Sequence, residues 1–179
     1  MRTIKKRISF ILSGFIILLL ISCNKTDSSK EITKQKTAVS KFKVSEKDIK
    51  SITYTEFALS DLSETATSDW FKFQELQEKI AQLKKGDFAF FKEEKVILQR
   101  FFKDLIIEMP VSLNITPILV RVSVLETTVY KLQGIINLKN IRKELILIAI
   151  KDVFVSNSNI ILQLNKKLEK ESQPIQNYN

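Results

Sequence analysis

The sequence predicts an all-α fold, an antiparallel bundle of four to five helices placed after an N-terminal leader and a flexible tether. In most of the chain after residue 45, apolar residues recur every three or four positions, which is the period of an amphipathic helix. Glycine and proline are scarce, with 3 of each in 179 residues, whereas a β-sandwich or barrel needs a turn signal about every 8–12 residues. Long helices are therefore favoured over strands.

Residues 1–22 have the pattern of a secretory signal peptide. Four basic residues among the first seven precede an apolar run, residues 8–21, in which two serines are the only polar members. This run is shorter than the roughly 17–25 residues that a membrane-spanning helix needs, and its basic start is typical of a signal peptide. Cleavage is predicted before Cys23.

The four residues at that site, Leu20-Ile21-Ser22-Cys23, resemble the lipobox of bacterial lipoproteins. The resemblance implies that Leu20, Ile21 and Ser22 are recognised by the signal peptidase and that the Cys23 thiol receives diacylglycerol. It also implies at least two acyl chains on this cysteine, which would anchor the protein stably, whereas one short chain binds reversibly. The alternative is an ordinary secretory leader or an uncleaved anchor, which would leave Cys23 as an unpaired thiol.

The residues after Cys23 predict where in the cell envelope the protein resides. Asn24 occupies the position at which an Asp favours inner-membrane retention in enteric bacteria, and residues 25–28 contain one acid, Asp27. A surface-export signal in Bacteroidota has an acidic cluster there. The expected location is the periplasmic face of the outer membrane, rather than the cell surface or the inner membrane.

Residues 23–44 are predicted to be the lipidated cysteine and a disordered tether. The tether is rich in Lys, Ser and Thr and has too little apolar surface to offset its ordering entropy. As a coil, it would span about 25 Å. Its lysines could contact anionic lipid headgroups, and the alternative is that the tether is an ordinary solvated spacer.

Most of the formal net charge of +9 lies outside the predicted bundle. The leader holds four positive charges and residues 24–44 a net +4, which leaves +1 on residues 45–179. Because binding to a phosphate backbone scales with the number of charges neutralised, no nucleic-acid partner is expected.

Residues 45–179 are the predicted helical bundle domain. Ser45, followed three residues later by Asp48, is typical of an N-terminal cap and starts a first helix that should reach about Ser60. Ser68 is predicted to cap a second helix, which ends at Lys84-Lys85-Gly86. Its apolar stripe consists of Trp70, Phe73, Leu76, Ile80 and Leu83.

A third helix is predicted from Asp87 to Met109, ended by Pro110. A fourth segment begins at Thr116-Pro117, where proline suits a first helical turn. Its residues 118–136 fit a helical seam, although residues 118–124 also alternate like a strand. Helix is preferred because the segment runs for about twenty residues without a turn.

The fifth segment, from about Leu138 to Glu171, fits either one long helix or a hairpin within residues 153–164. A helical seam through its first half brings Asp152 and Asn159 into an otherwise apolar stripe. These two residues are candidate interaction residues, at the margin of a central helix or in contact with a partner protein. The alternative is that Asp152 lies on a solvated edge of the helix and that residues 156–159 mark a kink.

The residue content argues against most catalytic sites. The chain has no histidine, and Cys23 is its single cysteine, which removes imidazole and thiol chemistry. No glycine-rich phosphate loop occurs. Carboxylates such as Glu93-Glu94, Glu108 and Glu126 remain, but solvated helix charges explain them better than a catalytic pair. We expect no catalytic residue, no metal, no cofactor and no enzymatic activity.

Seven of the nine phenylalanines after residue 45 fall between Phe71 and Phe102. Facing helices that fill one core explain this concentration, and a pocket for a lipid or a partner helix is the alternative. Three function classes follow. The preferred one is a membrane-anchored interaction or adaptor module that holds an envelope protein partner. The second is a carrier or sensor for an apolar small molecule or lipid, and the third is a carboxylate-dependent enzyme.

The layout of the whole chain also carries a resemblance. The lipobox, the Lys/Ser/Thr tether, the aromatic-rich helix around residues 70–83 and the helix that begins at Thr116-Pro117 together resemble the small, uncharacterised helical lipoproteins of Flavobacteriia and related Bacteroidota. The resemblance implies the compartment and the fold class, and it implies no particular chemistry.

Overall fold

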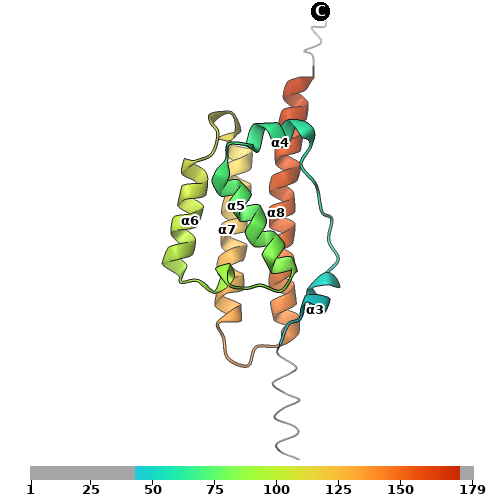
Figure 1. Ribbon diagram of the computed structural model, residues 1–179, viewed down its shortest axis with the longest axis vertical. Helices are drawn as coiled ribbons and strands as arrows, with labels where there is room; N and C mark the ends of the chain where they lie inside the picture. Colours follow the sequence, from blue (N-terminus) through green and yellow to red (C-terminus); the bar gives the residue numbers. More distant parts are fainter. Residues whose placement is uncertain (1–42, 174–179) are drawn as a thin grey trace, which may run out of the picture. The chain divides into compact units, whose positions relative to one another are not determined.

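The computed structural model describes residues 43–173, which form six α-helices and two short 3-10 helices and contain no β-strand. The predicted all-α helical bundle is therefore confirmed. The predicted leader, the lipobox and most of the tether lie outside the described residues. The elements, in chain order (Figure 1), are α3 (Glu46–Lys50), α4 (Asp61–Thr67), α5 (Phe71–Lys84), η2 (Phe90–Lys92), α6 (Lys95–Ile107), η3 (Val111–Leu113), α7 (Thr116–Ile136) and α8 (Lys143–Ser172).

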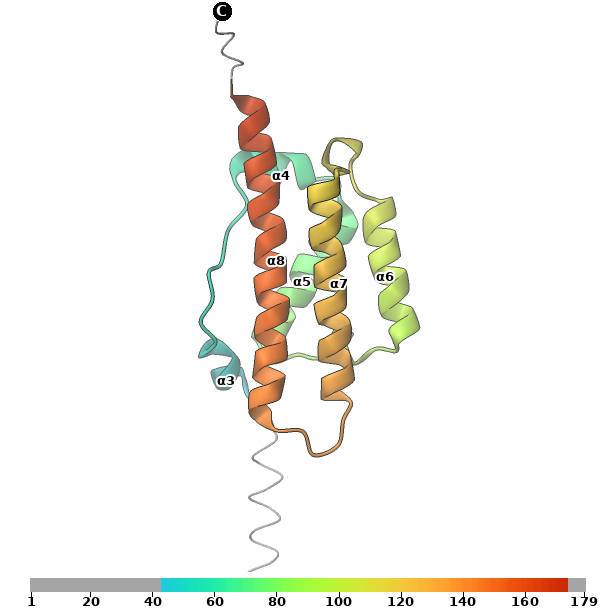
Figure 2. The same cartoon turned by 180° about the vertical axis from the view of Figure 1, so that it is seen from behind.

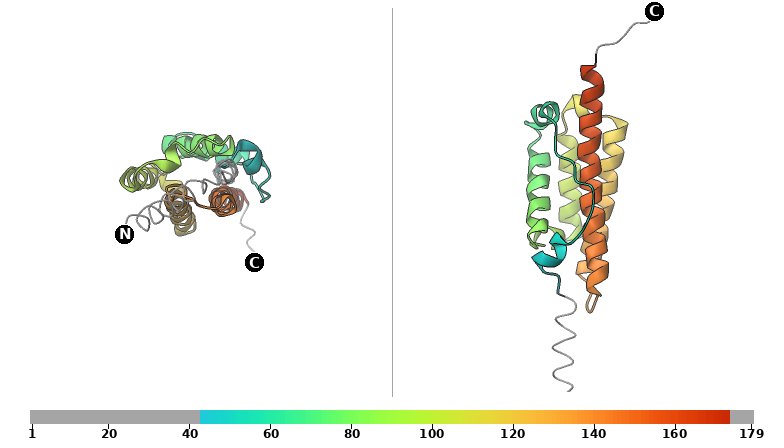
Figure 3. Two further views of the ribbon diagram at one scale, coloured as in Figure 1. Left: turned by 90° about the horizontal axis from the view of Figure 1, so that it is seen from below. Right: turned by 90° about the vertical axis from the view of Figure 1, so that its right-hand side faces the viewer.

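The four long helices α5, α6, α7 and α8 run in alternating directions (Figure 1). Viewed along the bundle, α5 and α6 form one layer, and α7 and α8 form the other (Figure 3). The α7–α8 pair packs along most of its length (Figure 2). The helix α8 also contacts α3 and α4, so it connects the N-terminal elements to α7.

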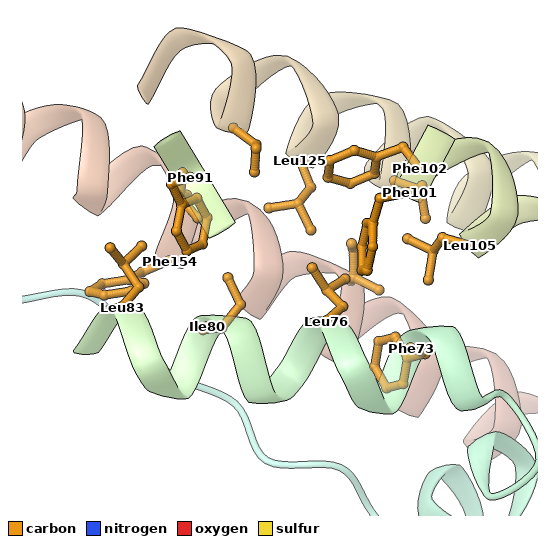
Figure 4. Packing of buried hydrophobic residues seen from close by; sticks show 14 of the residues in the cluster. Phe73, Leu76, Ile80, Leu83, Phe91, Phe101, Phe102, Leu105, Leu125 and Phe154 are labelled. Carbon is orange, nitrogen blue, oxygen red and sulfur yellow. The ribbon is translucent and has the colours of Figure 1, made fainter. Parts of the chain in front are cut away.

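The hydrophobic core lies between these two layers and is filled by the predicted apolar stripes. Phe73, Leu76 and Leu83 of α5 are fully buried and point toward the other helices (Figure 4). The Trp70 ring stacks on Phe73 with ring centroids 4.8 Å apart, and its Nε1–H donates to the Leu105 carbonyl at 2.9 Å. The concentration of aromatic residues therefore serves the core, as the interpretation of facing helices predicted.

The first predicted helix is much shorter than expected. Ser45 and Asp48 do form a reciprocal capping box, but α3 ends at Lys50. Residues 52–60, which we call the strap, are extended and run beside α8 to the start of α4 (Figure 3). The prediction of helix to Ser60 was wrong because side chains of α8 bind the strap backbone and replace the hydrogen bonds of a helix. Ser60 instead caps α4 by accepting from the Ser63 N–H.

The second and third helices also begin later than predicted. Ser68 ends α4 and does not start α5, since its hydroxyl donates to the Thr65 carbonyl at 2.9 Å. The segment expected to be one helix from Asp87 is interrupted. The Asp87 carboxylate accepts from the Ala89 N–H at 2.8 Å, η2 follows, and the backbone is extended at Glu93 and Glu94 before α6 begins.

The two ambiguous segments are both helical. The helix α7 covers Thr116–Ile136 with proline in its first turn, and the strand alternative is excluded. The helix α8 is continuous over Lys143–Ser172, which excludes the hairpin and places residues 156–159 inside the helix. Among the described residues, α8 has the length and hydropathy of a membrane span, but 56% of that window is buried inside the bundle. We interpret α8 as a core helix.

Candidate docking face

The layer of α7 and α8 has an outer surface that no other described helix covers (Figure 2). On α7, the stripe Ile118, Val122, Leu125, Val129 and Leu132 is buried in the core. A second stripe, spaced by four and three residues, faces outward and contains Val120, Val124 and Thr127. The two valines are 54% and 49% exposed. The helix therefore presents apolar side chains on two sides, which is more than the core requires.

The outer stripe of α8 is the seam in which the sequence placed Asp152 and Asn159. Ile148 and Val155 are exposed, Asn159 is exposed, and Asp152 is half-buried. We call this surface the outer face, formed by Val120, Val124, Thr127 and Lys131 of α7 with Ile148, Asp152, Val155 and Asn159 of α8. The two predicted interaction residues thus lie on one surface, one heptad apart.

A cross-helix ion pair joins the two stripes. The Lys131 ammonium lies 2.7 Å from the Asp152 carboxylate, and their side chains are 52% and 36% exposed. An exposed pair of this kind contributes at most about 1 kcal/mol to stability. Its main consequence is that a positive and a negative charge lie side by side among the apolar residues of the two helices.

Sequence analysis missed the polar residues that are buried on the opposite side of α8. Ser156, Asn157 and Ser158 are all buried, although their polar run was interpreted as a turn or a kink. The Asn157 and Gln77 side-chain amides exchange two hydrogen bonds of 3.0 Å, which tie α8 to α5. The Ser156 hydroxyl donates to the Asp152 carbonyl of its own helix. Nothing in the local sequence pattern identifies these distant partners.

The strap is held by two side chains of α8 that are seven residues apart. The Ser158 hydroxyl accepts from the Phe57 N–H at 3.0 Å and donates to the Thr55 carbonyl at 2.9 Å. The Asn165 amide accepts from the Ser60 N–H at 2.9 Å and donates to the Ala58 carbonyl at 2.8 Å. Each side chain therefore satisfies one donor and one acceptor of an extended segment, as a neighbouring β-strand would.

A surface cleft of about 460 Å³ lies between α3, the strap, α5 and α8. Its apolar lining is Ile49, Ile52, Tyr54, Ala81 and Phe154, and its charged lining is Glu46, Lys50, Glu56, Lys84 and Lys85. The Glu56 carboxylate pairs with Lys84 and accepts a hydrogen bond of 3.0 Å from the Tyr54 hydroxyl. This volume is within the range of small-molecule sites, roughly 300–1,000 Å³.

The two carboxyl groups of this cleft, Glu46 and Glu56, both have lowered pKa values. A hydrogen bond from Lys84 is the largest cause that lowers the pKa of Glu56, against the opposing effect of burial. A hydrogen bond and the charge of Lys50 lower the pKa of Glu46. A carboxyl group that acts as a general acid near neutral pH needs a raised pKa, and neither of these two has one.

Two of the carboxylates named from the sequence accept hydrogen bonds from other residues of the bundle, and they do so on different helices. Glu108 accepts from the Lys72 N–H at the start of α5, and Glu126 accepts from the Tyr130 hydroxyl on the next turn of α7. Burial and the Glu126 carboxylate raise the pKa of Tyr130. Among residues 43–173, no group of three or more metal-binding side chains occurs.

No protein family, curated protein or solved structure matches this chain. The function is therefore inferred from the residues and their geometry alone.

Proposed function

We propose that this chain is a lipid-anchored protein of the bacterial envelope, whose helical bundle binds a protein partner through the outer face. The anchor is the predicted lipid on Cys23. The observation that supports a binding role is a core of fully buried apolar side chains combined with exposed apolar residues in helical register on α7 and α8. Because these apolar residues are exposed, they do not contribute to the core, and a partner could cover them.

The partner that best fits the outer face is an amphipathic helix of another envelope protein. Val120, Val124 and Thr127 follow one another at steps of four and three, and Ile148 and Val155 are one heptad apart. This spacing accepts the side chains of a third helix in the groove between two packed helices. The Lys131–Asp152 pair lies within the same surface and would favour a partner with a complementary pair of charges.

Crosslinking in living cells tests the docking role. A photo-reactive amino acid placed at Val124 or Val155 should capture one defined protein, whereas the same residue at the exposed Glu78 of α5 should not. With the photo-reactive residue at Val124, Ile148→Asp combined with Val155→Asp should abolish the capture without unfolding the bundle, because both side chains are exposed. Equal capture from Glu78 would contradict the proposal, and capture of a second copy would identify the partner as the chain itself.

The anchor is tested separately. Cys23→Ala should abolish labelling by a fatty-acid analogue and either release the protein from membranes or leave the precursor uncleaved, since the chain has a single cysteine. Ser28→Ala, a similarly small change in the predicted tether, should have no effect. Continued labelling of the Cys23→Ala protein would contradict the predicted lipidation.

The cleft of about 460 Å³ favours a second candidate function, a carrier or sensor for an apolar molecule. Its rim carries Lys50, Lys84 and Lys85, which suit an amphiphile with a negative head group. Phe154→Ala should then weaken binding of a fluorescent fatty acid, and Val124→Asp should not. We rank this function second because the cleft is open and because four of its five charged side chains pair with each other, Lys50 with Glu46 and Lys84 with Glu56.

A further inference from the structure

We infer that the end of the bundle formed by α3 and the α7–α8 loop lies against the membrane and contacts anionic lipid headgroups. We call it the α3 end and define it as residues 43–50, 84–95 and 136–146, which lie at the same end of the bundle (Figure 1). This inference rests on the lipid anchor proposed above. It adds a second contact with the membrane, made by the folded domain itself.

Charge is strongly asymmetric along the bundle. The α3 end contains ten Lys and Arg residues against six Asp and Glu, a net +4, whereas the other described residues contain ten against twelve, a net −2. Three of the ten basic residues already pair with acids, Lys50 with Glu46, Lys84 with Glu56 and Lys143 with Asp48. The excess positive charge of the folded domain is therefore concentrated at one end.

Apolar side chains accompany this charge, which favours a lipid surface over other polyanions. Leu138 is 58% exposed in the loop between α7 and α8, and Lys139 and Arg142 of the same loop are exposed. Asn140 of this loop has φ 61°, in the left-handed region that asparagine tolerates better than most residues. An exposed leucine beside two cations suits the boundary between headgroups and acyl chains, whereas a nucleic acid would gain little from it.

A cleft at the same end has matching chemistry. Its volume is about 330 Å³, and Lys43 and Lys92 line it together with Gly86 and four apolar residues, Val44, Phe88, Ile136 and Ile146. The Lys92 ammonium lies 5.8 Å from the centre of the Phe88 ring. Apolar walls with two ammonium groups fit a molecule that has a negative head and an apolar body.

The point at which the predicted tether enters the bundle also indicates the α3 end. Lys43, the first described residue, lines this cleft, so the segment that leads to Cys23 joins the bundle at the α3 end. The span predicted for the tether is about 25 Å. The 30 residues of α8 extend about 45 Å at 1.5 Å per residue. The far end of the bundle is therefore farther from the α3 end than the tether typically spans.

Two labelled variants of the mature, lipidated protein test this arrangement. With Cys23 carrying lipid, Leu138→Cys and Val111→Cys each provide one thiol for a fluorophore. Val111 is a matched control because it is exposed and belongs to η3, in the α6–α7 connection at the opposite end of the bundle (Figure 1). In vesicles that contain phosphatidylglycerol and a quencher-bearing lipid, the label at 138 should be quenched and the label at 111 should not. The difference should shrink in purely zwitterionic vesicles and at high salt.

Charge variants provide the second measurement. Lys139→Gln with Arg142→Gln should weaken docking on the order of 25-fold, about fivefold for each basic residue near an anionic surface. Lys166→Gln with Lys170→Gln, which removes two exposed charges at the other end, should leave quenching unchanged. Protein that floats with vesicles but shows equal quenching at 138 and 111 overturns this inference alone. If the protein does not float with vesicles and the fluorophore reacts with Cys23, the result overturns the anchor and this inference together.

Discussion

The Lys131–Asp152 ion pair lies on the outer face, where water screens both charges. We expect Asp152→Leu to change the free energy of unfolding by no more than about 0.5 kcal/mol, as surface substitutions usually do. It should nevertheless reduce capture of a partner by a crosslinker at Val124, because the paired charge within the surface is lost. A denaturant midpoint that shifts by several times this amount would show that Asp152 has a structural role instead.

The amide pair of Gln77 and Asn157 should behave in the opposite way. Asn157 is 6% exposed, and each single substitution, Gln77→Leu or Asn157→Leu, leaves the remaining amide without its partner at a cost of about 1–3 kcal/mol. The double substitution should cost clearly less than the sum of the two single ones, because no polar group is then left unpaired. Chemical denaturation of the four proteins measures this coupling, and strictly additive losses would contradict it.

The Ser158 hydroxyl is one of the two side-chain groups that hold the strap, and Ser156 provides the control. Ser158→Ala removes the partner of both the Phe57 N–H and the Thr55 carbonyl, so it should cost about 1–3 kcal/mol. Ser156→Ala removes only a bond to the Asp152 carbonyl of the same helix, an i−4 bond that adds little to helix stability, so it should cost clearly less than Ser158→Ala. Hydrogen exchange at the Phe57 amide should accelerate in the first variant and not in the second.

The attachment of α3 to α8 should depend on pH through Asp48. Hydrogen bonds from the Lys143 ammonium at 2.9 Å and from the Ser45 hydroxyl and N–H lower the pKa of Asp48 well below its ordinary value. Its stabilising contribution is therefore complete above the ordinary value, about pH 4, and is lost as the pH falls toward the lower, folded value. Asp48→Asn should reduce the denaturant midpoint at pH 6 and have a smaller effect near pH 3.

The helices that could be predicted are those whose partners lie within the same periodic pattern. The stripe of α5 and the seam of α7 were correct because burial repeats every three or four residues. The strap and the buried polar run could not be predicted in this way. Phe57 finds its acceptor 101 residues away on Ser158, and Gln77 is 80 residues from Asn157, distances over which local propensity carries no information.

For the candidate site, the spacing in the sequence placed Asp152 and Asn159 on one face of a helix and left the surroundings of that face open. Asp152 and Asn159 were placed in one stripe from spacing alone, and the structure places that stripe on the outer face. Their alternation with Ile148 and Val155 does not distinguish a core seam from an exposed one. That distinction depends on which side of α8 the other helices occupy.

At the scale of the whole molecule, a soluble protein that begins at Ser45 should be a monodisperse, mainly helical domain. Ser45 is the first residue of the capping box that starts α3, so the fragment keeps every helix of the described bundle. Its net charge is +1, and we expect negligible affinity for DNA at physiological salt. Circular dichroism dominated by strand, or tight binding to DNA that salt reverses, would contradict this expectation.

The strap also determines how the bundle would respond to a mechanical load. It runs beside α8 from the α3 end toward α4 (Figure 3), and Ser158 and Asn165 grip it at two points along that path. A pull on the chain at Lys43, while the outer face is held, would first load α3, which Lys143 of α8 holds through Asp48. Once α3 detached, the force would act along the strap and load the hydrogen bonds of Ser158 and Asn165 in shear. Much of the resistance to extension would therefore come from side chains of α8, the longest helix of the described bundle.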